Sequence, residues 1–288
     1  MKVSVVLASY NSFATINYCL NSLFRQTCHP DEIIVVDSSS DPTISFIERN
    51  YPSVKLIKRQ ERTYCGAARN IGVRAATGDI IAFTDTDCVV AHNWIEEIIR
   101  SHRQHDAIAI GGAIHNGNQH NWISWAEYFL AASEYFAKAP QRNLRTIAGC
   151  NATYKRIAFE KYGYLPEISA FEDVLFNIRL NKAGEKILFE PSIQVSHLYR
   201  TKLNALLQHE FRNVRAMKEA AQIEQFKEKV FLKHPLIPIL WTPAKFLLIT
   251  NRILRWNRTA IFRFLVATPY VLMGLLATTY GLMSKRCE

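Results

Sequence analysis

Short apolar runs and amphipathic stretches alternate along the first 84 residues of the chain. The apolar runs are rich in β-branched residues and predict buried strands at residues 3–7, 32–36, 54–57 and 80–83. Apolar residues recur at helical spacing in the stretches between them, at 13–26, 44–50 and 67–76. Buried strands that alternate with amphipathic helices favour an α/β fold with a doubly wound, mainly parallel sheet and flanking helices.

The pattern continues less regularly to about residue 200. Further strands are predicted at 108–112, 186–190 and 194–197. The predicted helices are an aromatic-rich one at 122–138 and a second at 171–182, which Gly184 would cap. We therefore assign residues 1–200 to a single α/β domain.

The last third of the chain has a different composition. Residues 202–231 carry an apolar stripe flanked by basic residues and predict an amphipathic helix. Residues 235–250 are apolar but contain prolines and a lysine, and residues 264–283 contain no charged residue. We expect an amphipathic helical segment at 201–234, followed by a hydrophobic, membrane-associating region at 235–288.

The stretch 264–283 has three possible placements. It is as long as the about 20 residues that cross a bilayer core, which predicts a transmembrane helix. The alternatives are a shallow hairpin with 235–250 in the membrane interface, or a buried helix of a soluble protein. Four arginines precede the stretch, and Lys285 and Arg286 follow it. Basic residues favour the cytoplasmic side, so we expect the N-terminal domain on the cytoplasmic face of the cell membrane.

Composition adds information on charge and redox state. The 288 residues include 35 Lys and Arg against 25 Asp and Glu, a formal net charge of +10. This balance attracts phosphate groups on nucleotides, nucleic acids or anionic lipids, and no long basic block selects among them. The six cysteines form no CxxC pair and are expected to be free thiols in a reducing compartment. The apolar run at the N-terminus is too short for a secretory signal peptide.

Two carboxylates follow the predicted strand at 80–83, in the sequence Asp85-Thr86-Asp87. Ligands of open α/β sheets bind at the carboxyl ends of the strands. Side chains at positions i and i+2 of an extended chain point to the same side, and paired carboxylates suit Mg²⁺ or Mn²⁺ carrying a diphosphate. A polar turn after a strand would have the same sequence, so the tripeptide alone does not decide between the two interpretations.

The turn after the first strand argues against two classes of nucleotide-binding protein. Dinucleotide-binding folds and P-loop ATPases have glycine-rich sequences at this point, whereas residues 8–12 read Ala-Ser-Tyr-Asn-Ser. Tyr10 instead offers an aromatic ring and a hydroxyl at the end of the strand. Asp37, after the second strand, can accept hydrogen bonds from a base or a ribose.

Six short segments, taken in order, resemble the inverting glycosyltransferases of family 2, which have the GT-A fold. The segments are VVLASYN (5–11), EIIVVDSSSD (32–41), GAARNIG (66–72), DTD (85–87), GCN (149–151) and ED (172–173). The resemblance covers roughly the first 200 residues. The chain departs from it at Ser38, where the family often has a second acid, and at Ala8, near which it often has proline.

The resemblance implies a metal-dependent site for a nucleotide-sugar donor. Asp87 would be the main ligand of Mg²⁺ or Mn²⁺, Asp85 would contact the ribose or reach the metal through water, and His197 would be a further ligand of the metal or diphosphate. The implied donor-binding residues are Ser9, Tyr10, Asp37, Arg69 and Asp85. A divalent metal would stabilise the charge that develops on the diphosphate leaving group.

The resemblance also implies residues for the acceptor. Inversion requires a base that takes the proton of the attacking hydroxyl, and Asp173 matches the base of the family. Glu172, Gly149 and Asn151 would line the acceptor site. The side chains of Glu172 and Asp173 are also typical of the first turn of any helix, which is the structural alternative.

The sequence thus predicts an inverting hexosyltransferase that moves a sugar from a nucleotide-sugar donor to a glycan or lipid-linked acceptor at the membrane. Nucleic acid is not an expected partner. The alternatives are a sugar-phosphate nucleotidyltransferase, which would normally have a glycine-rich basic loop after the first strand, and a catalytically silent membrane scaffold of the same fold. The intact acids at positions 85, 87 and 173 argue against the scaffold.

Overall fold

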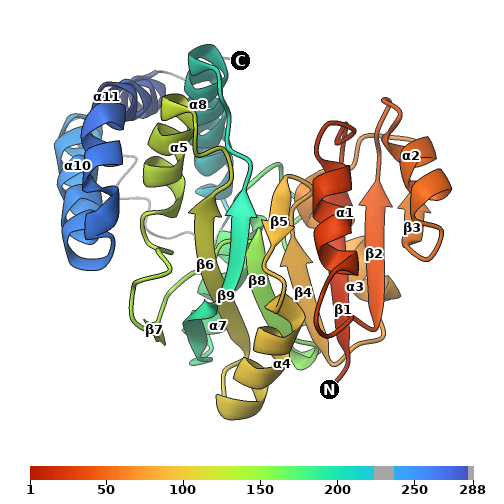
Figure 1. Ribbon diagram of the computed structural model, residues 1–288. Coiled ribbons are helices and arrows are strands. Elements are labelled where there is room, and N and C mark those ends of the chain that lie inside the picture. Colours follow the sequence, from red (N-terminus) through yellow and green to blue (C-terminus); the bar gives the residue numbers. More distant parts are fainter. Residues whose placement is uncertain (224–236, 285–288) are drawn as a thin grey trace. The chain divides into compact units, whose positions relative to one another are not determined.

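The computed structural model describes residues 1–223 and 237–284, and these contain a mixed nine-stranded sheet with helices on both faces (Figure 1). The strand order is β3-β2-β1-β4-β8-β6-β9-β5, and β7 pairs with β9. The α/β fold class expected from the sequence is therefore confirmed.

The first half of the sheet is parallel, as the alternation of strands and helices predicts. Its strands are β1 (Val3–Ser9), β2 (Glu32–Asp37), β3 (Lys55–Lys58) and β4 (Ile80–Thr84). They are connected through α1 (Ile16–Phe24), α2 (Thr43–Asn50) and α3 (Cys65–Ala75). The register pairs Ser9 at the end of β1 with Asp37 at the end of β2, so both lie at the carboxyl edge of the sheet.

The second half of the sheet contains antiparallel pairs. Strand β8 (Asn151–Lys155) runs antiparallel to β4 and to β6 (Ala109–Asn116). Strand β9 (Ile187–His197) is continuous where the sequence predicts two shorter strands, because Pro191 and Ser192 interrupt the apolar pattern without ending the strand. The remaining strands are β5 (Cys88–Val90) and β7 (Arg142–Asn143).

Three helices of this part of the chain complete the layers. They are α4 (Trp94–Gln104), α6 (Ile157–Tyr162) and α7 (Glu172–Lys182). Helix α7 begins one residue after its predicted start and ends as predicted, with Gly184 in the left-handed region at φ 81°. Helix α4 was not among the predicted elements, although Trp94, Ile95 and Ile98 form a buried stripe along it.

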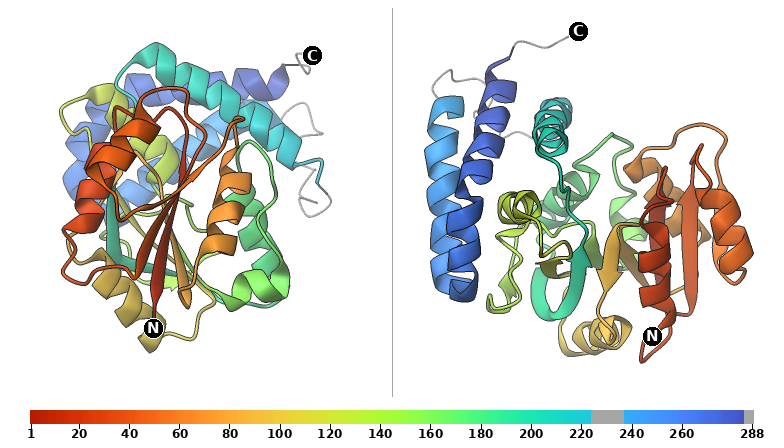
Figure 2. Two further views of the ribbon diagram at one scale, coloured as in Figure 1. Left: turned by 90° about the vertical axis from the view of Figure 1, so that its right-hand side faces the viewer. Right: turned by 45° about the horizontal axis from the view of Figure 1, so that its top comes forward.

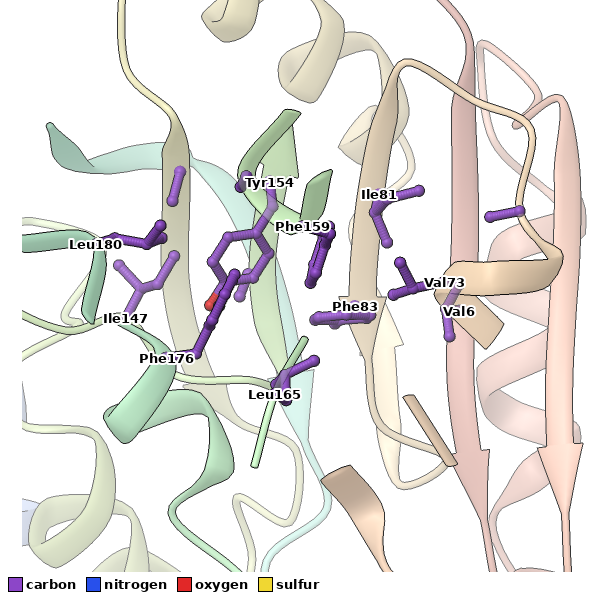
Figure 3. Close-up of a cluster of buried hydrophobic side chains, with 14 of the residues drawn as sticks. Val6, Val73, Ile81, Phe83, Ile147, Tyr154, Phe159, Leu165, Phe176 and Leu180 are labelled. Atoms are coloured by element: carbon purple, nitrogen blue, oxygen red, sulfur yellow. The ribbon is translucent and has the colours of Figure 1, made fainter. Parts of the chain in front are cut away.

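A large hydrophobic core fixes α3, α6 and α7 against one face of the sheet (Figure 3). Phe83 of β4 and Tyr154 of β8 contribute fully buried rings. Phe159 of α6 stacks on Phe176 of α7 with ring centroids 5.1 Å apart. Burial of an aromatic side chain contributes about 1.5–3 kcal/mol, so this core holds the N-terminus of α7 rigidly against the sheet.

The described residues divide into two compact units. One comprises 1–114 and 141–196, and the other comprises 115–140 and the described residues from 197 onward. The helices of the second unit are α5 (Trp122–Ala132), α8 (Leu203–Ala220), α10 (Ile237–Trp256) and α11 (Ile261–Met283), with a short 3₁₀ helix at Arg258–Ala260. Helix α11 packs against α5, α8 and α10.

The structure describes part of the segments predicted for the C-terminal third of the chain. Among the described residues, one helix, Arg258–Met283, is long and apolar enough to cross a membrane, and it contains the predicted stretch 264–283. The structure does not describe all of the predicted segments. Outside the described residues lie 224–231, 235–236, Lys285, Arg286 and Cys287. The five described cysteines are free thiols, as expected.

Candidate active site

The Asp85-Thr86-Asp87 tripeptide joins β4 to β5 at the carboxyl edge of the parallel strands. Thr86 is buried, and its hydroxyl lies 2.8 Å from the hydroxyl of Ser12. Asp85 and Asp87 are both partly exposed. The tripeptide therefore turns its threonine inward and leaves both carboxylates accessible, which is the arrangement that the i, i+2 spacing predicts.

Arg69 connects this tripeptide to a second pair of acids. It lies on α3, is only 2% exposed, and places its guanidinium over the ring of Phe83. One guanidinium nitrogen donates to Asp85 Oδ1 at 2.8 Å, and another donates to Glu172 Oε1 at 2.7 Å. Arg69 therefore binds two carboxylates that are distant in sequence, instead of presenting its charge to solvent.

Asp173 is held next to the same arginine by backbone contacts. Its Oδ2 accepts a hydrogen bond of 2.7 Å from the Gly149 N–H, and its Oδ1 accepts one from the Val174 N–H. A Cβ atom on Gly149 would lie 2.4 Å from Arg69 Nη1, so only glycine allows this close approach. The segments 149–151 and 172–173 thus meet around Arg69.

Burial affects the carboxylates at the start of α7. Burial raises the pKa of Asp173 above its ordinary value, although Arg69 and the two N–H donors oppose this. Burial also raises the pKa of Glu172, against the opposing charge of Arg69. Phe171, just before them, is in the left-handed region at φ 67°, which is rare for a bulky residue and typical of functional sites.

The residues predicted to bind the nucleotide lie at the ends of β1 and β2. Asp37 is buried and accepts hydrogen bonds from the Ser39 N–H at 2.7 Å and hydroxyl at 3.0 Å. The buried Ser9 hydroxyl, beside it in the register, has no hydrogen-bond partner among the described residues. The ring of Tyr10 is 41% exposed, and the Arg62 guanidinium lies 4.5 Å from its centroid.

Asn151 is buried and makes hydrogen bonds that hold neighbouring elements together. It is 1% exposed, and its Oδ1 accepts from Trp94 Nε1 at 2.9 Å. Its Nδ2 donates to the carbonyls of Ala113 and Ile193 at 2.9 and 3.0 Å. Asn151 therefore ties together β8, β6, β9 and α4, and a direct contact with the acceptor stays a prediction.

His197 is the last residue of β9, and its ring stacks on that of Tyr199 with centroids 4.4 Å apart. It belongs to the second compact unit, whereas Asp85 and Asp87 belong to the first. Its assignment as a ligand of the metal or diphosphate stays a prediction.

Comparison with known proteins identifies the family. Residues 4–163, more than half of the chain, match the family described as glycosyl transferase family 2. The chain belongs to glycosyl transferase family 2. A glucosyl-dolichyl phosphate glucuronosyltransferase of Haloferax volcanii is 22% identical over 237 residues, which are 73% of this chain and 74% of that protein.

Solved structures of glycosyltransferases share the fold. Mannosyltransferase PcManGT of Pyrobaculum calidifontis, solved with GDP-Man and Mn²⁺, gives a TM-score of 0.63 at 19% identity over 97% of this chain and 86% of that one. S. aureus TarS 1–349, solved with UDP-GlcNAc, gives a TM-score of 0.59 at 16% identity over 96% and 90% of the two chains. This family 2 glycosyltransferase therefore has the GT-A fold.

The chemistry of the donor atoms at the carboxyl edge fits a hard divalent cation. Asp85 and Asp87 present carboxylate oxygens, which Mg²⁺ and Mn²⁺ prefer. The neighbouring Cys88 thiol is fully buried, and this burial raises its pKa well above the ordinary value.

Arg62 is a candidate that the sequence analysis missed. Its guanidinium lies over the rings of Tyr10 and Tyr64, at the edge where Ser9 and Asp37 lie. The sequence feature that could have indicated Arg62 is the basic loop between the third strand and the third helix, which also contains Arg59. Helical and strand periodicity cannot assign a role to an irregular loop of this kind.

Replacing Arg69 by glutamine is expected to destabilise this glycosyltransferase. The change removes the partner of the buried Glu172 and of Asp85, and breaking a buried ion pair costs about 3–5 kcal/mol. The midpoint of urea unfolding should fall accordingly. The matched control is Arg74→Gln on the exposed face of the same helix, where little change is expected. Equal midpoints for the two variants would contradict the role given to Arg69.

Proposed function

We propose that this family 2 enzyme is a metal-dependent, inverting hexosyltransferase that moves a sugar from a nucleotide-sugar donor to a glycan or lipid-linked acceptor. The observation that carries the proposal is the convergence of two acid pairs on Arg69. This arginine contacts Asp85 on one side and Glu172 on the other, and Asp173 follows directly. A donor-side metal site and an acceptor-side base then lie within one compact unit.

Asp85 and Asp87 are proposed to hold Mg²⁺ or Mn²⁺ together with the donor diphosphate, with His197 as a further ligand. The bound cation supplies positive charge that stabilises the diphosphate leaving group. Arg69 fixes the orientation of the Asp85 carboxylate, which leaves its second oxygen for the ribose or a metal-bound water. Asp87, which is partly exposed, is proposed as the main ligand.

The nucleoside is proposed to bind at the ends of β1 and β2. The exposed ring of Tyr10 provides a stacking surface for the base, and the nearby guanidinium of Arg62 adds positive charge. Ser9 and Asp37, which are buried at the same edge, are proposed to make polar contacts with the nucleoside.

Asp173 is proposed to be the general base. The Gly149 N–H holds Oδ2 and the Val174 N–H holds Oδ1, and a remaining lone pair of the carboxylate accepts the proton of the acceptor hydroxyl as the hydroxyl oxygen attacks the anomeric carbon. The anomeric bond to the diphosphate breaks on the opposite face of the sugar. The buried ion pair of Glu172 with Arg69 keeps α7 in position. Gly149 is proposed to line the acceptor side, and the buried Asn151 to support that side from within the sheet.

The names of similar proteins support the classes of donor and acceptor. The mannosyltransferase and TarS structures contain GDP-Man and UDP-GlcNAc, which are nucleotide sugars. The Haloferax relative is named for a dolichyl phosphate, which is a lipid-linked acceptor. Nucleic acid is not a proposed partner.

The proposed location is the cytoplasmic face of the cell membrane. The candidate span Arg258–Met283 and the arginines before it support attachment through the C-terminal region. Residues 1–200 would form the catalytic domain, 201–234 an amphipathic segment and 235–288 the membrane-associating region.

The stereochemistry of the product tests the proposed mechanism. A single displacement by the acceptor hydroxyl is expected to convert an α-linked nucleotide sugar into a β-linked product. Proton NMR of the anomeric signal, recorded early in the reaction, measures the configuration directly. A product that retains the donor configuration would contradict the role of Asp173 as a base for direct displacement.

A further inference from the structure

The two faces of α11 differ in what they contact. One face packs within the second unit, where Phe264 meets Phe129 of α5 and Gly274 leaves room for Leu130. Two polar contacts attach the same helix to α8. The Thr278 hydroxyl donates to Glu210 at 3.0 Å, and Lys218 Nζ donates to the Gly281 carbonyl at 2.8 Å. This face of α11 is therefore held by protein rather than open to lipid.

The opposite face of α11 is apolar and exposed. It carries large hydrophobic side chains at helical spacing, of which Phe262 is 68% exposed and Leu265 is 64% exposed. The face continues through Leu272, Met273, Leu276, Tyr280 and Met283. Exposed apolar surfaces of this extent are typical of membrane or protein interaction sites rather than of free solvent-facing helices.

Helix α10 also exposes large apolar side chains. It lies beside α11 in both views of the ribbon (Figures 1 and 2), and the hydroxyls of Thr242 and Thr279 are 2.6 Å apart. Thr242 is near the start of α10 and Thr279 is near the end of α11, so the two helices form an antiparallel hairpin. The exposed large side chains of α10 are Ile239, Leu240, Leu247, Leu248 and Leu254.

Basic residues gather where the two helices connect. Arg255, Arg258 and Arg263 are all exposed and are interleaved with the exposed Ile261 and Phe262. An apolar surface bordered by arginines fits the interface of a bilayer, where the apolar side chains enter the acyl region and the guanidiniums meet lipid phosphates. Charge complementarity therefore favours an anionic lipid surface as the occupant of this face.

The polar contacts of the packed face argue against a full span. Glu210 is on α8, is contacted by Thr278 and has a pKa raised by burial to about 7. Lys218, also on α8, donates to two carbonyls at the end of α11. If α11 crossed the bilayer, α8 with its charged residues would have to enter the hydrocarbon core beside it or lose these contacts.

We propose that the α10–α11 hairpin lies in the plane of the membrane and inserts its exposed apolar face into an anionic leaflet without crossing it. This inference deepens the membrane location in the proposed function and rests on it. The arginines of the connection bind lipid phosphates, and the packed face of α11 remains attached to α5 and α8. The protein is then monotopic, with both ends of α11 on the side of the catalytic domain.

Vesicle flotation with the full chain tests the lipid surface. Binding to phosphatidylcholine vesicles should be weak and should rise when phosphatidylglycerol is included. Leu265→Glu is expected to lower binding about tenfold or more, and Arg255→Gln about fivefold on the mixed vesicles only. The matched controls are Ile157→Glu, an exposed apolar residue of α6, and Arg103→Gln, an exposed arginine of α4. Equal losses in the controls, or no binding by the wild type, would overturn the proposal.

Topology distinguishes an in-plane hairpin from a span. Thr259→Cys and Ser284→Cys place thiols before and after α11. In inside-out vesicles from expressing cells, a membrane-impermeant maleimide should label both variants above the parent chain without detergent. Protection of one site until detergent is added would establish a span and overturn the proposal. Hydrolysis of a soluble nucleotide sugar by the same vesicles reports the proposed catalytic function separately.

Discussion

Replacing Asp173 by asparagine is expected to lower sugar transfer by about 10²–10⁴-fold, the usual contribution of a general base. The amide is close in size to the carboxylate and can still accept a hydrogen bond from the Gly149 N–H through its oxygen. It cannot take a proton from the acceptor. Donor affinity should change little, because Asp173 is not a proposed donor ligand and the donor-side carboxylate that contacts Arg69 is Asp85. Initial transfer rates and donor titration by calorimetry measure the two effects.

The control for this variant is Asp106→Asn, an exposed aspartate that pairs with Lys155 at the surface. It should transfer sugar at the wild-type rate, because surface ion pairs contribute little. If Asp173→Asn loses donor affinity as strongly as rate, Asp173 is a binding residue and the assignment of the base is wrong. Unchanged thermal unfolding of Asp173→Asn would separate a chemical effect from a loss of fold.

Replacing Asp87 by asparagine is expected to abolish turnover that depends on metal. The change removes one negative charge and one hard oxygen ligand from the partly exposed side of the tripeptide. The fold should persist, because the buried residue of this turn is Thr86 and the ion pair of this turn with Arg69 is made by Asp85, not by Asp87. Mn²⁺ titration of transfer, with circular dichroism as a check of the fold, measures this. Near-normal activity in saturating Mn²⁺ would remove Asp87 from the metal site.

The parallel half of the sheet could be predicted from local patterns alone. Buried runs such as 32–36 alternate with amphipathic stretches, and a parallel sheet is the arrangement that buries both. The tripeptide at 85–87 was predicted to lie at the carboxyl edge for the same reason. The antiparallel pairing of β8 with β4 was not predicted, because it depends on contacts between segments about 70 residues apart rather than on periodicity.

The contacts between side chains in the candidate site also could not be predicted from the sequence. Arg69 was predicted to bind the donor, and the structure pairs it with Glu172, which is 103 residues away. Gly149 was predicted to line the acceptor site, and a Cβ atom there would meet the guanidinium of Arg69. Motif order indicated that these residues belong to one site, but side-chain partners are decided by tertiary packing.

The most direct test of the central claim is a panel of UDP-, GDP- and dTDP-sugars incubated with the protein of residues 1–288. We expect turnover of a donor with Mn²⁺ or Mg²⁺, release of the nucleoside diphosphate, and loss of activity in EDTA that added metal restores. Asp87→Asn should be inactive in the same assay. Turnover that persists undiminished in EDTA would contradict the account. So would conversion of the donor and added pyrophosphate into a nucleoside triphosphate and a sugar 1-phosphate, which is the reverse reaction of a nucleotidyltransferase.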